Sequence, residues 1–236
     1  MPHPFIISPC TPTDAPELGR AQHTIFQSPI YRTIYASVPL EAQLAKFTKS
    51  IATGIAEQTH PTPGREITWL KCTTDDNEIV AYINWIYMPT GYRVEDDHQA
   101  TVKDMPAGTN LAVIEEFYRV ARVMRAEHHG RRGPHFLLSL LGTLPKFERR
   151  GAASRLIAWG LERADQMGVP AYVDSSPTGL KLYEKMGFRA CGEMMVDLGR
   201  FEGVDGKEGG LGVQRWVAMR REPVKREGGA DGRDDE

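Results

Sequence analysis

The segment "PKFERRGAASRLIAWGLERAD" runs from Pro145 to Asp165 and decides the fold, because it leads from an apolar strand into an amphipathic helix. The run before it, "PHFLLSLLGTLP" at 134–145, is almost continuously apolar, which is typical of a strand covered on both faces. Apolar and small residues recur at helical spacing after Gly151, and "AYVDSS" at 171–176 predicts the next strand. The order strand, helix, strand predicts a parallel pair of strands joined by a helix.

The turn that begins this helix has the properties of an anion site. Gly151, Ala152 and Ala153 are small enough to leave the backbone N–H groups of the first helical turn accessible, and those groups carry a partial positive charge. Arg149 and Arg150 could hold phosphate oxygens from the side. The turn fits neither the pattern GxxxxGK[ST] nor GxGxxG. The alternative is that two arginines merely precede a helix, and the turn alone leaves both interpretations open.

The remaining segments predict a single α/β (α+β) domain with a mixed central sheet. Alternating or apolar runs rich in β-branched and aromatic residues predict further strands at 4–9, 67–74, 78–88, 188–201 and 210–221. Helical spacing predicts helices at 11–27, 39–58, 113–124 and 177–187. A long polar loop follows residue 88, and the polar tail at 222–236 is expected to be disordered. The sheet would therefore have six to seven strands and be flanked by helices.

Charge and composition exclude several classes of protein. With 236 residues and a net charge of −2, the chain has no overall field that would favour nucleic acid or an anionic membrane. No apolar stretch is long enough for a membrane span, and the first residues lack a secretory pattern. The three cysteines form no CxxC pair, so we expect neither a metal site nor disulfides. A cytoplasmic location is the expectation that follows.

The order and spacing of two motifs resemble those of the GCN5-related N-acetyltransferase (GNAT) superfamily. Residues 148–153, "ERRGAA", follow the acyl-CoA loop consensus Q/R-x-x-G-x-G/A, with Glu148 where the consensus has Gln or Arg. About 30 residues later, "SPTGLKLYEKMGF" at 176–188 resembles the last motif of the superfamily, and the style is that of a small fungal-type member. The resemblance spans roughly residues 65–200. It implies a single N-acetyltransferase-like domain at 1–221, with helical acceptor-side elements at about 13–60 and an acyl-CoA core at about 65–200.

This resemblance also implies a donor, an acceptor and a way of holding the donor. The donor would be acetyl-CoA, and its acetyl group would pass to the amine of a small molecule or peptide by direct attack. Two parallel strands would splay apart, and the pantetheine arm would pair with the backbone of Leu141, Gly142 and Thr143. The amides from Arg149 to Ser154 would hold the pyrophosphate. A homodimer is compatible with this description, and no nucleic-acid or membrane partner is implied.

The catalytic candidates are a tyrosine and a carboxylate. Tyr183, in "LYEKMGF", would give a proton or a hydrogen bond to the departing thiolate, since a tyrosine has a pKa near 10 and a thiol one near 8.5. Asp174, at the end of a predicted strand, is the candidate for the general base, with Glu115, Glu116 and His135 as rivals. A chain of water molecules without a single base is a further alternative.

Several alternatives stay open at the level of the sequence. Because Glu148 replaces Gln or Arg, the domain could bind acyl-CoA as a sensor without catalysis, or catalyse O-acylation or decarboxylation on the same scaffold. The basic run "ARVMRAEHHGRR" could bind an anion, but cations also gather at helix C-termini for electrostatic reasons. The aromatic residues Trp85, Tyr87 and Tyr92 could line an acceptor pocket or belong to the core.

Overall fold

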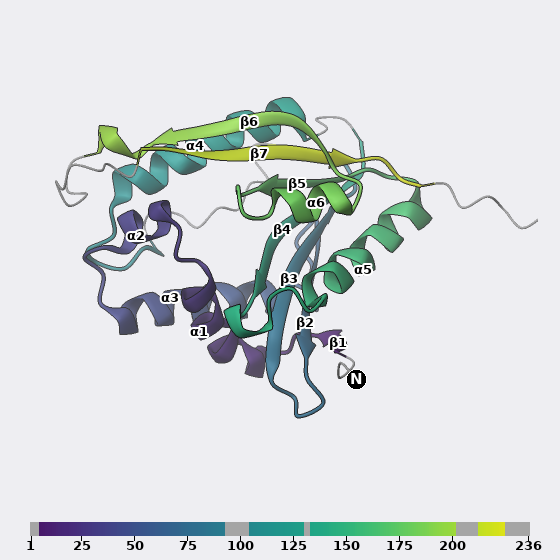
Figure 1. Cartoon of the computed structure of the whole chain (residues 1–236), viewed down its shortest axis with the longest axis horizontal. Coiled ribbons are helices and arrows are strands. Elements are labelled where there is room, and N and C mark those ends of the chain that lie inside the picture. Colours follow the sequence, from purple (N-terminus) through teal and green to yellow (C-terminus); the bar gives the residue numbers. More distant parts are fainter. Residues whose placement is uncertain (1–4, 93–103, 130–132, 202–211, 225–236) are drawn as a thin grey trace, which may run out of the picture.

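The computed structural model describes residues 5–92, 104–129, 133–201 and 212–224. Its centre is a seven-stranded sheet in the order β1-β2-β3-β4-β5-β7-β6, in which β4 and β5 are parallel and every other neighbouring pair is antiparallel (Figure 1). The strands are β1 (Ile6–Pro9), β2 (Glu66–Thr73), β3 (Ile79–Met88), β4 (His135–Thr143), β5 (Ala171–Ser175), β6 (Arg189–Asp197) and β7 (Val213–Arg221). The helices are α1 (Ala15–Ile25), α2 (Pro29–Tyr35), α3 (Leu40–Ala56), α4 (Leu111–His128), α5 (Ala152–Met167) and α6 (Leu180–Lys185).

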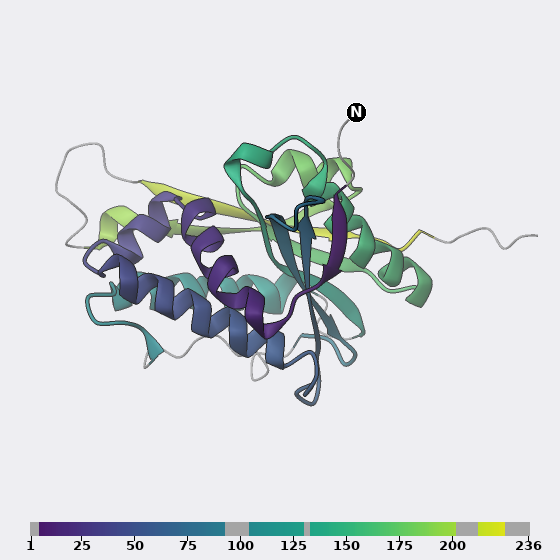
Figure 2. The same cartoon turned by 90° about the horizontal axis from the view of Figure 1, so that it is seen from below.

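Helices cover both faces of the sheet because side chains alternate along each strand. In β2 and β3, Leu70 and Ile83 pack in one core with Leu156 and Ile157 of α5. Their neighbours Trp69 and Tyr82 point to the opposite face, into a second core formed with α1 and α3. Figures 1 and 2 show the resulting three layers, with the sheet between α5 on one side and the N-terminal helices on the other.

The helix α4 continues the second layer toward the other end of the sheet. Its residues Ala121 and Met124 pack against Met194 of β6 and Ala218 of β7. The backbone N–H of Asn110, just before α4, donates to the carbonyl oxygen of Ile34 in α2. The helix α2 therefore joins the N-terminal helices to α4. This helix, at Pro29–Tyr35, was not among the helices expected from the sequence.

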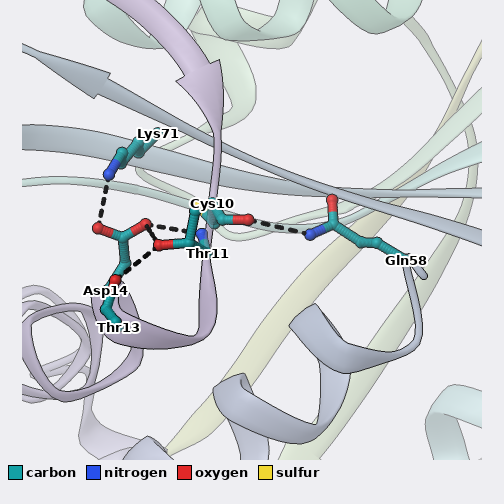
Figure 3. Close-up of polar contacts among 6 residues, drawn as sticks. All are labelled: Cys10, Thr11, Thr13, Asp14, Gln58 and Lys71. Atoms are coloured by element: carbon teal, nitrogen blue, oxygen red, sulfur yellow. Dashed lines mark hydrogen bonds and ion pairs between the residues drawn. The ribbon is translucent and has the colours of Figure 1, made fainter. Parts of the chain in front are cut away.

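A polar junction fixes the N-terminal helices on the sheet (Figure 3). The Asp14 carboxylate accepts from the backbone and hydroxyl of Thr11 and lies 2.5 Å from the Lys71 ammonium group of β2. The Gln58 side chain, which follows α3, donates to the Cys10 carbonyl oxygen at 3.3 Å and accepts from the backbone N–H of Trp69 at 2.7 Å. Both α1 and α3 are therefore anchored to β2 at the same place.

The parallel pair separates part of the way along its length. Phe136, Leu137 and Leu138 of β4 pair with 171–173 of β5, and the pairing ends there although both strands continue. On its other side β4 remains paired with β3 up to Thr143, and the register skips Ser139. One edge of β4 after Leu138 is thus unpaired with β5, and Figure 1 shows the two strands diverging. The mixed sheet with a splayed parallel pair confirms the predicted fold class.

Most of the expected tail, and the centre of the loop after β3, lie outside the described residues. The structure likewise leaves out 130–132 in the basic run and 202–211 between β6 and β7. Within the described ranges, no helix is long and apolar enough to cross a bilayer.

Candidate active site

The separation of β4 from β5 brings the predicted backbone site to an opening in the sheet. Leu141, Gly142 and Thr143 lie on the part of β4 that is unpaired with β5. Gly142 allows close packing, since a Cβ there would lie 3.0 Å from both Ile25 Cδ1 and Tyr82 Cε1. The absence of a side chain lets the C-terminal end of α1 approach β4 at this point. The backbone of β4 is therefore held between α1 on one face and the opening at its edge.

The predicted anion turn has the backbone shape that such a site needs. After a short 3₁₀ turn at Pro145–Phe147, Arg149 and Gly151 have φ angles of 64° and 89°, both in the left-handed region. Within the described part of the chain, no hydrogen bond occupies the backbone N–H groups from Arg149 to Ser154, and no side chain caps α5. Consecutive free amides at a helix start form a concave anion site.

Open space lies in front of these amides. A Cβ placed on Gly151 would have no atom within 4 Å, so the glycine is needed for its left-handed φ and not to relieve crowding within the fold. Arg149 and Arg150 are exposed beside it. The guanidinium carbon of Arg150 lies 5.5 Å from the centre of the Phe147 ring, which orients this side chain at the turn. Glu148 is also exposed.

Tyr183 lies on α6, close to the end of β5. Its ring packs against Phe188 at a centroid distance of 5.8 Å, and Gly179 leaves room for it, because a Cβ there would lie 2.9 Å from Tyr183 Cε2. Burial, and after it the negative charge of Asp174, raise the pKa of Tyr183. The phenol therefore stays protonated near neutral pH and is better suited to donate a hydrogen bond than to transfer its proton completely.

Asp174 occupies the last part of β5, where the strands have separated, and it is engaged by two basic groups of α4. Its Oδ2 accepts from Arg125 Nε at 2.7 Å, and its Oδ1 lies 2.7 Å from Nε2 of His129, the residue that follows the helix. The second contact has the distance of an ion pair but not the alignment of a hydrogen bond. Burial would raise the pKa of Asp174, but the nearby His129 and the charge and hydrogen bond of Arg125 outweigh it and hold the pKa below its usual range.

The three rival candidates for the base differ in their surroundings. Glu115 is exposed on α4, and Glu116 is bound by Arg119 through contacts of 2.7 and 2.9 Å. His135 is buried at the opposite end of β4 from the opening, and burial lowers its pKa to about 4. In the basic run, Arg125 and His129 turn toward Asp174, while Arg131 and Arg132 lie outside the described residues.

The aromatic residues singled out from the sequence lie away from the opening. Trp85 is 1% exposed beneath α5, where a Cβ on Gly160 would lie 2.2 Å from its ring. Tyr92 belongs to a small core with Leu137 and Tyr172. Tyr87 is half-buried against Phe136 and lines a shallow groove near the C-terminal end of α5. Of the two interpretations left open, the structure favours core packing.

The aromatic residues that do lie near the opening were missed from the sequence. A cavity of about 250 Å³ lies between the end of α1, α2 and α3, and Phe26, Tyr31, Tyr35 and Phe47 line it. Ile25, next to Phe26 in the chain, is the residue that contacts Gly142 of β4. The only signal in the sequence was the aromatic spacing of "IFQSPIYRTIY", which includes the unexpected helix α2.

Comparison with known proteins bears on this geometry. Residues 98–200 match a family model described as the acetyltransferase (GNAT) domain. A "Probable acyltransferase SID5" of Ajellomyces capsulatus is 42% identical over 49 residues, which are 21% of this chain and only 36% of that relative. The sequence match therefore spans about a third of the relative's length.

Two solved structures share the fold over nearly the whole chain. Arylalkylamine N-acetyltransferase 2 of Aedes aegypti is 10% identical, with a TM-score of 0.62 and coverage of 93% of this chain and 99% of that one. The polyamine N-acetyltransferase of Drosophila melanogaster is 12% identical, with a TM-score of 0.59 and coverage of 93% and 100%. Such identities speak for the fold alone. Residues 98–200 thus match the acetyltransferase (GNAT) domain model, and the shared fold and the splayed β4–β5 pair agree with that match.

Proposed function

We propose that this protein transfers an acetyl group from acetyl-CoA to the amine of a small molecule or peptide by direct attack. The observation that carries the proposal is the parting of β4 from β5 after Leu138, directly upstream of six free amides at the start of α5. The unpaired edge of β4 offers backbone groups for an extended pantetheine arm, and the start of α5 offers an anion site. A pantetheine diphosphate needs both.

The donor side would use backbone and small residues for most of its contacts. Amides from Arg149 to Ser154 would bind the pyrophosphate, with the Arg149 and Arg150 guanidinium groups closing the site from solvent. The unpaired edge of β4 at 141–143 would hold the pantetheine amides. A backbone N–H of that edge would also polarise the thioester carbonyl and stabilise the charge that develops on its oxygen.

The transfer itself requires a neutral amine and a leaving thiolate. The amine nitrogen forms a bond to the acetyl carbon, the carbon–sulfur bond breaks, and the proton lost by the amine balances the charge of the CoA thiolate. We assign Tyr183 to donate a hydrogen bond to the departing sulfur. The basic groups that lower the pKa of Asp174 make it a weak proton acceptor. We therefore assign it to orient the neighbouring groups and assign proton removal to water.

Turnover and binding measured together test this proposal. Release of free CoA thiol from acetyl-CoA should depend on an added amine, and calorimetry should detect CoA binding. Tyr183→Phe should lower kcat by roughly 10²- to 10⁴-fold with little change in the Kd for CoA, the range for loss of one acid–base group. Tyr87→Phe is the matched control, because Tyr87 lies near the far end of α5.

Charge reversal at the anion turn gives a second test of the proposed function. Arg150→Glu should weaken CoA binding at least tenfold, whereas Arg122→Glu, at an exposed site on α4, should not. Tight CoA binding without turnover with any amine would support a non-catalytic sensor instead. If calorimetry detects no binding of CoA, the proposed donor site is wrong. The cytoplasmic location, the homodimer and the single-domain division stay predictions.

A further inference from the structure

The cavity on the acceptor side has an unusual wall of rings. Tyr31 is central, with ring centroids 5.5 Å from Phe26, 5.8 Å from Tyr35 and 6.2 Å from Phe47. Tyr35 and Phe47 meet edge to face at 5.3 Å. Rings at these spacings form preferred aromatic contacts, and a further ring can join the cluster in the same geometries. The cavity therefore favours a planar, apolar group over a flexible polar chain.

The cavity is lined by basic side chains and by no carboxylate among the described residues. Its described lining contains two basic side chains, His23 and Arg32, while the residues that complete it are two glutamines and an alanine. Within the described residues, neither the Arg32 guanidinium nor the His23 ring makes a hydrogen bond or ion pair. An ammonium group would meet no carboxylate among these lining residues, whereas a carboxylate would meet an available guanidinium fork.

Packed side chains connect the cavity to β4, the strand that would hold the donor: Phe26 lines the cavity, and its neighbour Ile25 contacts Gly142. Ile25 and Tyr82 both contact the position of Gly142, where a Cβ would lie 3.2 Å from Tyr82 Cζ, the carbon that carries the hydroxyl. Tyr82 is fully buried, and its hydroxyl has no partner within the described residues. Burial, and after it the neighbouring Tyr31, raise the pKa of Tyr82, so this hydroxyl is a neutral donor near the cavity.

From these contacts we infer that the acceptor is an alkylamine that carries both an aromatic ring and a carboxylate, with its ring among Tyr31, Tyr35 and Phe47 and its carboxylate at Arg32. This inference rests on the proposed function and names the substrate class of the same site. A cavity of roughly 150 Å³ accommodates benzene, so the cavity of about 250 Å³ leaves room for a ring with a short side chain. The amine would then extend along Ile25 toward the opening beside Gly142.

Rates of CoA release with four amines test the inference. L-Phenylalanine and phenethylamine differ only in the carboxylate, cyclohexylalanine replaces the ring by an aliphatic one, and spermidine carries further ammonium groups. We expect kcat/KM for phenylalanine to exceed that for cyclohexylalanine about threefold, since aromatic contacts contribute modestly beyond their area. Spermidine should be the poorest of the four.

The variant Arg32→Ala isolates the carboxylate contact. It should lower kcat/KM for phenylalanine roughly tenfold and that for phenethylamine less than twofold, because only the former loses a charge-assisted hydrogen bond. Comparing each substrate between the wild type and Arg32→Ala cancels the difference in amine basicity, because the same amine is measured in both proteins. Arg20→Ala is the matched control, since Arg20 is exposed on α1 and does not line the cavity.

The outcomes separate this inference from the proposed function. Release of CoA with spermidine or phenethylamine in clear preference to phenylalanine would leave acetyl transfer in place and overturn the assignment of the cavity. Equal losses for both aromatic substrates in Arg32→Ala would do the same. No release with any of the four amines, although CoA binds, would overturn the assignment of the cavity; absence of release with every other small or peptide amine would overturn the proposed function as well.

Discussion

His135 makes the stability of this protein depend on pH in a way that can be measured. It is the first residue of β4, 1% exposed, with Nδ1 3.2 Å from the carbonyl oxygen of Gly133. Its ring meets Tyr172 edge to face at 5.1 Å. Burial is the main cause that lowers its pKa from 6.5 to about 4, and the charge of the neighbouring His129 acts in the same direction, while the contact with Gly133 opposes both.

The lowered pKa means that the folded protein excludes a proton that the unfolded chain accepts. Stability is therefore complete above pH 6.5 and decreases as the pH falls from 6.5 toward 4. With 1.36 kcal/mol per pKa unit, the protonation of the unfolded chain at pH 5.0 removes about 2 kcal/mol, and at pH 7.5 almost nothing. This is a large fraction of the 5–15 kcal/mol that is typical of folded domains.

Urea unfolding at pH 7.5 and 5.0 measures this contribution. Between these two pH values, His135→Gln should lose about 2 kcal/mol less unfolding free energy than the wild type, whatever its stability at pH 7.5. The control His60→Gln removes an exposed histidine and should follow the wild type. Other groups around His135, including His129 and the Arg125–Asp174 pair, are present in both proteins and cancel in the difference. If the difference in unfolding free energy between the wild type and His135→Gln is the same at both pH values, the reasoning is refuted.

Three further predictions concern the site and its supports. Gly151→Val should cost about 1–2 kcal/mol, because φ is 89° there, and should raise the Kd for CoA at least tenfold by filling the space before the amides; calorimetry that finds unchanged affinity would contradict the donor site. Asp174→Asn should destabilise the protein by about 3–5 kcal/mol at pH 7 in urea unfolding, because Arg125 and the fully buried His129 lose their carboxylate. A loss under 1 kcal/mol would show that the ion pairs are unimportant. Gln58→Leu should cost about 1–3 kcal/mol, since the Trp69 N–H loses its acceptor; Gln166→Leu on α5 is the control, and equal losses in both variants would argue against the junction in Figure 3.

The repeating side-chain patterns were sufficient for most of the helices and strands and for the turn that we propose binds the donor. Alternation in β2 and β3, the apolar run of β4 and the helical spacing of α5 each depend on neighbours within a few residues, so they can be read from the chain alone. The glycine and small residues at the start of α5 likewise have a local meaning, because left-handed φ and exposed amides are properties of the turn itself. The helix α2 was missed because its seven residues, Pro29–Tyr35, are too few to show a clear period.

Long-range contacts, in contrast, were decided only by the tertiary structure. The sequence presents Asp174 as a free strand-end carboxylate. Arg125 and His129, 49 and 45 positions earlier in the chain, reach it when α4 packs on β6 and β7, and they change its acidity. Trp85 and the cluster around Tyr31 are equally aromatic, yet Trp85 lies beneath Gly160 and the Tyr31 cluster lines a cavity between the end of α1, α2 and α3. The burial of a side chain and the charges around it depend on which helices and strands pack together. Local patterns along the chain do not determine those long-range contacts.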